Sequence, residues 1–217
     1  MMRNNVVGFT VAWGSDRNLQ AAERVLALWS YHHGRARTVL IDPSGYMLDE
    51  REHIRTRVLD HVDDGDIAVY MDTDTVCLHN TLPDLGDAVL GMAADGDMQS
   101  VMRTEPRLLW YNRTYYNTGY FMVRKTPETV AMFNDWWGLR RACCGRYKDQ
   151  STFNQLTKTS SVPIQLLPSS CNYFMRWKVE EPPGGTCILH WAGVSDFLDE
   201  QDAWLTREER SAGIQPR

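Results

Sequence analysis

The sequence lacks the features that mark membrane-spanning, secreted and nucleic-acid-binding chains. No run of about 18 apolar residues occurs, and the apolar run near the start is too short for a signal peptide. We therefore expect a chain without a transmembrane segment. Basic residues are scattered and the net charge is -5, which argues against a nucleic acid as partner. Because no repeat or linker-like tract is visible, residues 1–217 are predicted to form a single domain.

Cysteine is scarce and its arrangement excludes an ordinary disulfide framework. The chain has 5 cysteines, an odd number, and Cys143 and Cys144 are adjacent. Their spacing does not match a structural metal site either. A reducing, cytoplasmic location is the simpler expectation.

Alternating strand and helix patterns characterise the first part of the chain. Three apolar runs bounded by turn residues predict strands, over residues 6–12, 38–41 and 66–71. Apolar residues at helical spacing predict helices between them, over 18–31 and around Ile54, Val58 and Val62. This order predicts an α/β fold with a mostly parallel central sheet flanked by helices. Residues 1–75 would then form a nucleotide-binding half.

The second half of the chain has a looser pattern. Further short strands are predicted over residues 89–93, 120–123, 164–167 and 187–191. Thr126 and Pro127 form a helix start signal, which predicts a helix over 127–141. The last eighteen residues are charged, and we expect them to be helical or frayed.

The triplet Asp72-Thr73-Asp74 directly follows the third predicted strand. Ligands of open α/β sheets bind at the carboxyl ends of their strands, and two carboxylates there suit Mg²⁺ or Mn²⁺. Two other interpretations remain open: a simple turn cap, or the start of a phosphatase whose first aspartate is the nucleophile. Such phosphatases usually begin at this strand, whereas a complete βαβα unit precedes it here.

Three more short motifs carry candidate chemistry. His190 lies at the end of an apolar strand and Gly193 in the turn that follows, and an imidazole there suits Mn²⁺ as a third ligand. Asn117 and Gly119 precede a predicted strand, where an amide and a glycine permit close contact with sugar hydroxyls. Asp149-Gln150 sets a carboxylate beside an amide before an apolar helix. Each motif also has an ordinary interpretation, respectively a core histidine, a turn and a helix cap.

Together the four motifs resemble the glycosyltransferases of GT-A fold, especially retaining enzymes in the style of glycogenin and bacterial lipopolysaccharide galactosyltransferases. In that family the Asp-x-Asp and the histidine of His-x-x-Gly hold a cation on the donor's diphosphate. The Asn-x-Gly contacts the donor sugar, and the Asp-Gln pair lies near the anomeric carbon. The matching residues here are Asp72, Asp74, Asn117, Gly119, Asp149, Gln150, His190 and Gly193.

The resemblance implies a Mn²⁺- or Mg²⁺-dependent transfer of a sugar from a UDP-sugar to an acceptor hydroxyl, with retention. By position, uracil would lie near Thr10, Ala12 and Trp13. The Asp-Gln pair is typical of retaining enzymes. An Asp-nucleophile phosphatase and a catalytically inactive nucleotide-sugar-binding relative are the alternatives.

One departure from the family concerns a phosphate-binding lysine, which often follows the His-x-x-Gly. Here Val194, Ser195 and Asp196 follow instead. Arg51 or Arg55, on the helical stretch before the Asp-x-Asp strand, would take over the phosphate. Aromatic residues between positions 103 and 116 suggest a carbohydrate acceptor, because aromatic faces stack on sugar rings.

Overall fold

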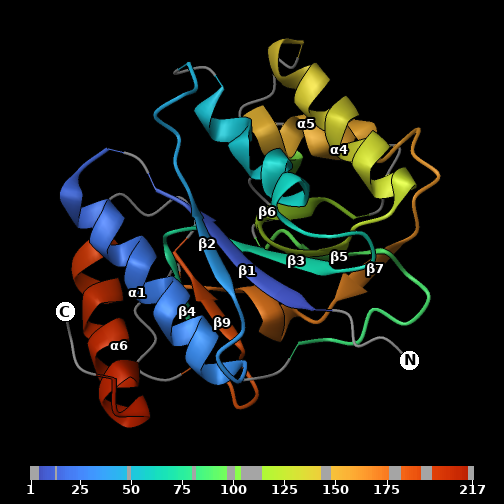
Figure 1. The fold of residues 1–217 in the computed structure, drawn as a ribbon. Helices are drawn as coiled ribbons and strands as arrows, with labels where there is room; N and C mark the ends of the chain where they lie inside the picture. Colours follow the sequence, from blue (N-terminus) through green and yellow to red (C-terminus); the bar gives the residue numbers. More distant parts are fainter. Residues whose placement is uncertain are drawn as a thin grey trace.

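A six-stranded sheet forms the centre of the protein (Figure 1). The computed structural model describes residues 5–12, 14–47, 50–79, 82–96, 101–103, 114–142, 148–175, 182–191 and 197–214. The strand order is β2-β1-β3-β6-β5-β7. In chain order these strands are β1 (Val6–Val11), β2 (Thr38–Ile41), β3 (Ile67–Met71), β5 (Leu90–Ala94), β6 (Tyr116–Arg124) and β7 (Ile164–Leu167). Only β6 runs against its neighbours β3 and β5, so the predicted mostly parallel sheet is confirmed.

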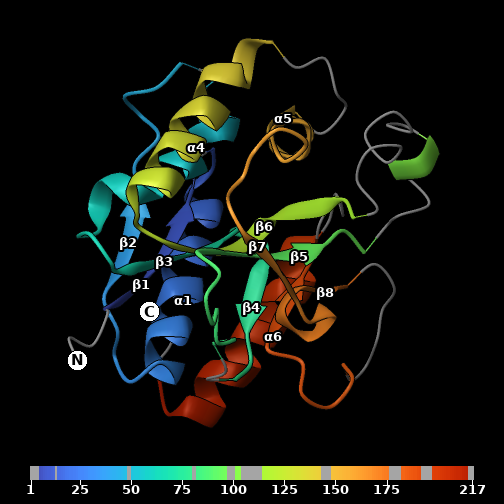
Figure 2. The same ribbon diagram turned by 90° about the vertical axis from the view of Figure 1, so that its right-hand side faces the viewer.

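Helices cover both faces of this sheet (Figures 1 and 2). One face carries η1 (Arg51–His61), α4 (Pro127–Gly138), η2 (Leu139–Arg141) and α5 (Lys148–Leu156). The other face carries α1 (Asp16–His32), α6 (Phe197–Ala212) and a small second sheet. That sheet has the order β4-β9-β8, with β4 (Thr75–Cys77), β8 (Tyr173–Phe174) and β9 (Ile188–His190), and the short η3 (Ser169–Asn172) leads into β8.

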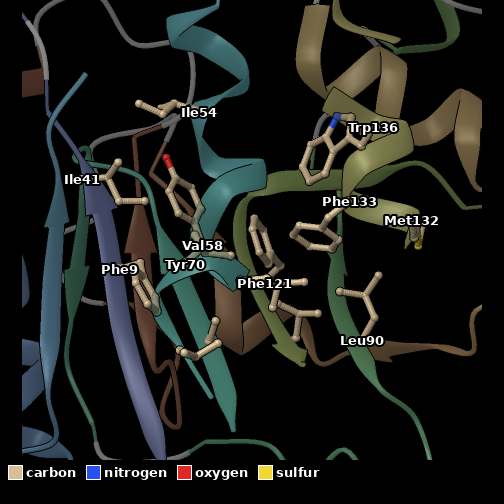
Figure 3. Packing of buried hydrophobic residues seen from close by; sticks show 14 of the residues in the cluster. Phe9, Ile41, Ile54, Val58, Tyr70, Leu90, Phe121, Met132, Phe133 and Trp136 are labelled. Carbon is tan, nitrogen blue, oxygen red and sulfur yellow. The ribbon is translucent and has the colours of Figure 1, made fainter. Parts of the chain in front are cut away.

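Aromatic packing fills the space between the central sheet and α4 and α5 (Figure 3). Phe121 stacks on Tyr70 with ring centroids 5.1 Å apart, and it meets Phe133 and Trp136 edge to face. Burial of such side chains is the main source of folding free energy. Helix α4 starts where the sequence predicts, because Thr126 caps it and Pro127 occupies its first turn.

The sequence patterns placed some element boundaries wrongly. Strand β6 begins at Tyr116 rather than at residue 120, so Asn117 and Gly119 lie inside the strand and not ahead of it. The segment with Ile54 and Val58 is helical but of 3₁₀ type, since the spacing of buried residues does not fix the hydrogen-bond pitch. The short strands β4 and β8 were not predicted at all.

Three buried cysteines, Cys77, Cys171 and Cys187, are free thiols. In the parts of the chain described above, no helix combines the length and the apolar character that crossing a membrane requires.

Candidate active site

The Asp72-Thr73-Asp74 triplet forms the turn between β3 and β4, as its position after an apolar strand predicts. The Thr75 hydroxyl donates a hydrogen bond to the Asp72 carbonyl at 2.7 Å, and the Trp191 amide donates to the Asp74 carbonyl at 3.0 Å. Strand β4 pairs with β9 so that Thr75 lies opposite His190. Backbone pairing between distant segments therefore brings the histidine beside the two aspartates.

The ligating atoms of Asp72, Asp74 and His190 all lie within 4.8 Å of one another. The His190 Nε2 atom is 3.3 Å from Asp74 Oδ1 and 3.8 Å from Asp72 Oδ2. Two ligands about 2.1 Å from one ion and at right angles to each other would be roughly 3 Å apart. Asp74 Oδ1 is buried and accepts no hydrogen bond from the described residues. A cation would compensate this oxygen, so the three residues fit a divalent metal ion.

Charge within this group shifts two pKa values. Burial lowers the pKa of His190, but the carboxylates of Asp74 and Asp72 outweigh burial and raise it. For Asp74 the two effects have the opposite signs: burial raises the pKa of its carboxyl, but the nearby His190 imidazole brings that pKa below its usual value. The pair of aspartates therefore favours a positive charge beside it.

Gly119 lies directly under the metal group. A Cβ atom at this position would lie 2.3 Å from His190 Cε1 and 2.7 Å from Asp72 Oδ2, far inside contact distance. The sequence suggested that this glycine lets a sugar approach. The structure gives it a further role, because only a residue without a side chain leaves room for both ligands.

Arg55 joins the metal group to Asp149. Its guanidinium lies 3.1 Å from Asp72 Oδ1 and 3.2 Å from Asp149 Oδ2, and the side chain is only 11% exposed. It also donates to the Thr118 carbonyl at 2.9 Å. Tyr70, under the guanidinium, donates its hydroxyl hydrogen bond to Asp72 Oδ1 at 2.7 Å.

Asp149 lies in the first turn of α5, where the Trp136 indole donates to its carbonyl at 2.9 Å. The Thr118 hydroxyl donates to Asp149 Oδ2 at 3.1 Å. Burial raises the pKa of this carboxyl to about 6, although Arg55 opposes the shift. The next residue, Gln150, accepts at Oε1 from Thr118 N at 3.1 Å and, across the strand, from the amide of Asn117 at 3.0 Å.

A cavity of about 260 Å³ opens over this arrangement. It is lined by Val11, Asn18, Arg55, Tyr70, Asp72, Thr73, Asp74 and Phe197. The described part of helix α6 contributes Phe197 to this lining and also supports the metal-binding turn, because Gln201 donates to the carbonyls of Thr73 at 2.5 Å and Thr75 at 3.0 Å.

The structure separates the predicted site residues into groups. It brings together Asp72, Thr73, Asp74, Asn117, Gly119, Asp149, Gln150 and His190. Arg55 rather than Arg51 is the arginine that lines the cavity. Thr10 and Ala12 are buried on either side of Val11, which faces the cavity. Trp13, Gly193 and most of the predicted acceptor stretch lie outside the described residues.

Comparison with known proteins agrees with this geometry. Residues 53–196 match the family model described as nucleotide-diphospho-sugar transferase. The chain belongs to this family. A search of curated proteins found no match to the chain.

Solved glycosyltransferase structures share the fold. One is a glycosyltransferase involved in glycosylation of the major capsid of PBCV-1, with TM-score 0.66 and 12% identity over 94% of this chain and 99% of that one. Another is the galactosyltransferase LgtC in complex with donor and acceptor sugar analogues, with TM-score 0.57 and 18% identity over 96% and 95%. The bifunctional glycosyltransferase WbbM gives TM-score 0.65 and 12% identity over 97% of this chain, which spans 52% of that one. The fold is therefore that of GT-A glycosyltransferases, as the motifs indicated.

Proposed function

We propose that the protein transfers a sugar from a UDP-sugar to an acceptor hydroxyl, with Mn²⁺ or Mg²⁺ held by Asp72, Asp74 and His190. The observation that carries this proposal is the three-ligand group at the cavity, connected to Asp149 through Arg55. A bound cation would offset the negative charge that gathers on the departing diphosphate. The histidine and the hard carboxylate oxygens together suit Mn²⁺ especially well.

The donor would lie along the carboxyl edge of the central sheet. We place uracil against the end of β1, near Thr10, Ala12 and Trp13, where the neighbouring Val11 faces the cavity. In this proposal, residues 1–75 bind the nucleotide and residues 76–217 bind the donor sugar and the acceptor. The remaining proposed donor contacts are Thr73, Asn117, Gly119, Gly193 and an arginine. Of the two candidate arginines, Arg55 lines the cavity and Arg51 does not.

Asp149 is the residue we place nearest the anomeric carbon. A pKa of about 6 leaves its carboxylate ionised at neutral pH, where it can stabilise positive charge that develops on the sugar. We expect retention of configuration, with Asp149 acting as nucleophile or as ion-pair partner. Gln150 would act beside it, because its amide orders Asn117 and the Thr118 backbone.

Two other features of the chain bear on the acceptor and the location. The aromatic residues between positions 103 and 116 favour a carbohydrate acceptor. The buried free thiols of Cys77, Cys171 and Cys187 favour a reducing compartment such as the cytoplasm.

Turnover of a panel of UDP-sugars tests the proposed function. UDP release should occur with Mn²⁺, fall strongly in EDTA, and be lost in His190→Ala, because the cation assists departure of the diphosphate. UDP binding without any turnover would indicate an inactive relative. Hydrolysis of phosphate monoesters, with no turnover of any UDP-sugar, would favour the phosphatase alternative.

A further inference from the structure

A chain of buried side-chain hydrogen bonds runs from Asp95, just after β5, to the metal-site histidine. The Gln150 amide donates to Asp95 Oδ2 at 2.8 Å, and the Asn117 amide donates to Gln150 Oε1 at 3.0 Å. The Asn172 amide donates to Asn117 Oδ1 at 2.9 Å, and Asn172 Oδ1 lies 2.8 Å from His190 Nδ1. All five side chains are buried.

Two backbone N–H groups fix the donor-to-acceptor direction of this series of hydrogen bonds. The Thr118 backbone N–H donates to Gln150 Oε1 at 3.1 Å, and the Gly119 backbone N–H donates to Asn117 Oδ1 at 2.9 Å. A backbone N–H can only donate, so each contact identifies which end of the side-chain amide is oxygen. Asp95 Oδ2 accepts from the Gln150 amide nitrogen, which agrees with the same direction.

The direction determines where the histidine carries its proton. Asn117 Oδ1 requires a donor from Asn172, so the Asn172 oxygen must face the imidazole. That oxygen can only accept, and His190 Nδ1 must therefore donate. In a neutral imidazole the lone pair then lies on Nε2, the atom that faces Asp72 and Asp74.

The negative charges of the site itself oppose a neutral imidazole with its proton on Nδ1. The two aspartates lie 3.3 and 3.8 Å from Nε2, and in the absence of a cation they would attract the proton to that atom. Turning the Asn172 amide to fit such a proton would set its oxygen against Asn117 Oδ1, in a buried position without compensation.

We propose that Asn172 is a positioning residue that keeps the His190 proton on Nδ1 and so prepares Nε2 to bind the cation. Asp95, Gln150 and Asn117 hold Asn172 in the required orientation. The inference rests on the proposed metal site and deepens it. It connects that site to Asn117 and Gln150, so the donor-sugar side and the metal side share one hydrogen-bonded chain.

The proton position can be measured by NMR on metal-free protein with ¹⁵N-labelled histidine, at a pH above the raised pKa of His190. Wild type should carry the proton on Nδ1. In Asn172→Leu it should move to Nε2, because a leucine of similar size offers no acceptor. Asn172→Asp still offers an oxygen to Nδ1 and should keep the wild-type proton position, although its second oxygen would meet Asn117 Oδ1 and lower stability.

Metal affinity measured by calorimetry with Mn²⁺ alone provides the second readout. Asn172→Leu should bind roughly 10- to 100-fold more weakly, the usual effect of removing a group that orients a metal-binding histidine. Asn172→Asp should bind more tightly than Asn172→Leu, because Nδ1 keeps its acceptor. Should the leucine variant fail to fold, Asn172→Ala takes its place.

The outcomes separate this inference from the proposed function. If wild type binds neither Mn²⁺ nor Mg²⁺, the metal site itself is wrong. If wild type binds but Asn172→Leu keeps both its affinity and an Nδ1 proton, the role of Asn172 is overturned and the metal site stands. If the proton lies on Nε2 in wild type, or moves to Nε2 in Asn172→Asp as it does in Asn172→Leu, the role of Asn172 is likewise overturned, because an acceptor at position 172 would then not determine the proton position.

Discussion

The two halves of strand β6 are equally buried but differ in chemistry. In the first half, Asn117 and Thr118 are 4% and 1% exposed, and both are polar. In the second half, Phe121 and Val123 are fully buried and apolar. The apolar half packs against α4 and η1 (Figure 3). The polar half faces His190, Arg55 and α5.

This difference separates what folds the chain from what forms the site. Apolar side chains lower the free energy of folding without specific partners, because burial alone is favourable. Buried polar groups are costly unless each has a partner, so the first half of β6 requires matching groups from several other elements. Those partners, drawn from η1, α5, η3 and β9, are the residues that form the candidate active site.

The largest effect on stability should come from the apolar half. Phe121→Ala removes a ring packed against Tyr70, Phe133 and Trp136, and should lower the free energy of unfolding by about 3–5 kcal/mol. Urea unfolding measures this loss. The protein that remains folded should still bind UDP with Mn²⁺, and loss of binding without loss of stability would break the comparison.

Asp149 should make stability depend on pH. Its pKa is raised from 3.8 to about 6 in the folded state, chiefly by burial, so the folded protein holds the proton more tightly than the unfolded chain. Stability is favoured at low pH and falls as pH rises from about 4 to about 6, by up to roughly 3 kcal/mol.

Asp149→Asn cannot ionise and serves as the reference for this effect. Unfolding of the metal-free proteins across this range should show wild type losing stability relative to Asp149→Asn. Parallel curves for the two proteins would mean that Asp149 has an ordinary pKa.

The same variant separates catalysis from binding. If Asp149 stabilises charge that exists mainly in the transition state, Asp149→Asn should lower kcat roughly 10²-fold or more, equivalent to about 2.7 kcal/mol, with UDP affinity nearly unchanged. Single-turnover rates and UDP titrations on one preparation measure both. Wild-type turnover would leave Asp149 as a helix-end residue, and a parallel loss of binding would move it to the phosphate side.

Gly119→Ala tests the polar half with a smaller cost in stability. The added methyl would collide with His190 and Asp72, so we expect overpacking of about 1–3 kcal/mol and at least a tenfold loss of Mn²⁺ affinity. Gly91→Ala is the matched control, because its Cβ would lie 2.7 Å from Leu85 Cδ2, at a position paired with Met122 in the apolar half. It should lose similar stability and no metal affinity, and equal affinity losses in both variants would contradict the assignment.

Local sequence patterns predicted the features that depend on neighbouring residues. Asp72 and Asp74 were predicted because they follow an apolar strand. Tyr70 was missed but could have been predicted as their neighbour, since residues two apart along a strand point to the same face and its hydroxyl contacts Asp72. Asp95 and Asn172 have no such signal. Their roles depend on contacts across 55 positions of the chain, which no local periodicity encodes.

The predicted strand boundaries were wrong for the same reason. Asn117, Thr118 and Gly119 are small and polar and so resemble a turn, yet Asp72 N donates to the Gly119 carbonyl at 2.8 Å and extends the strand. Arg55 and Arg51 are equivalent in sequence, and only the fold shows which of them meets the aspartates.

Thermal unfolding with UDP, with and without Mn²⁺, tests the central claim most directly. UDP at about 100 times its Kd should stabilise wild type by about 2.7 kcal/mol in Mn²⁺, and much less in EDTA, because the metal group holds the diphosphate. Asp74→Ala should show the same small shift in both conditions. Equal shifts in Mn²⁺ and EDTA for wild type would contradict a metal-dependent nucleotide site at Asp72, Asp74 and His190.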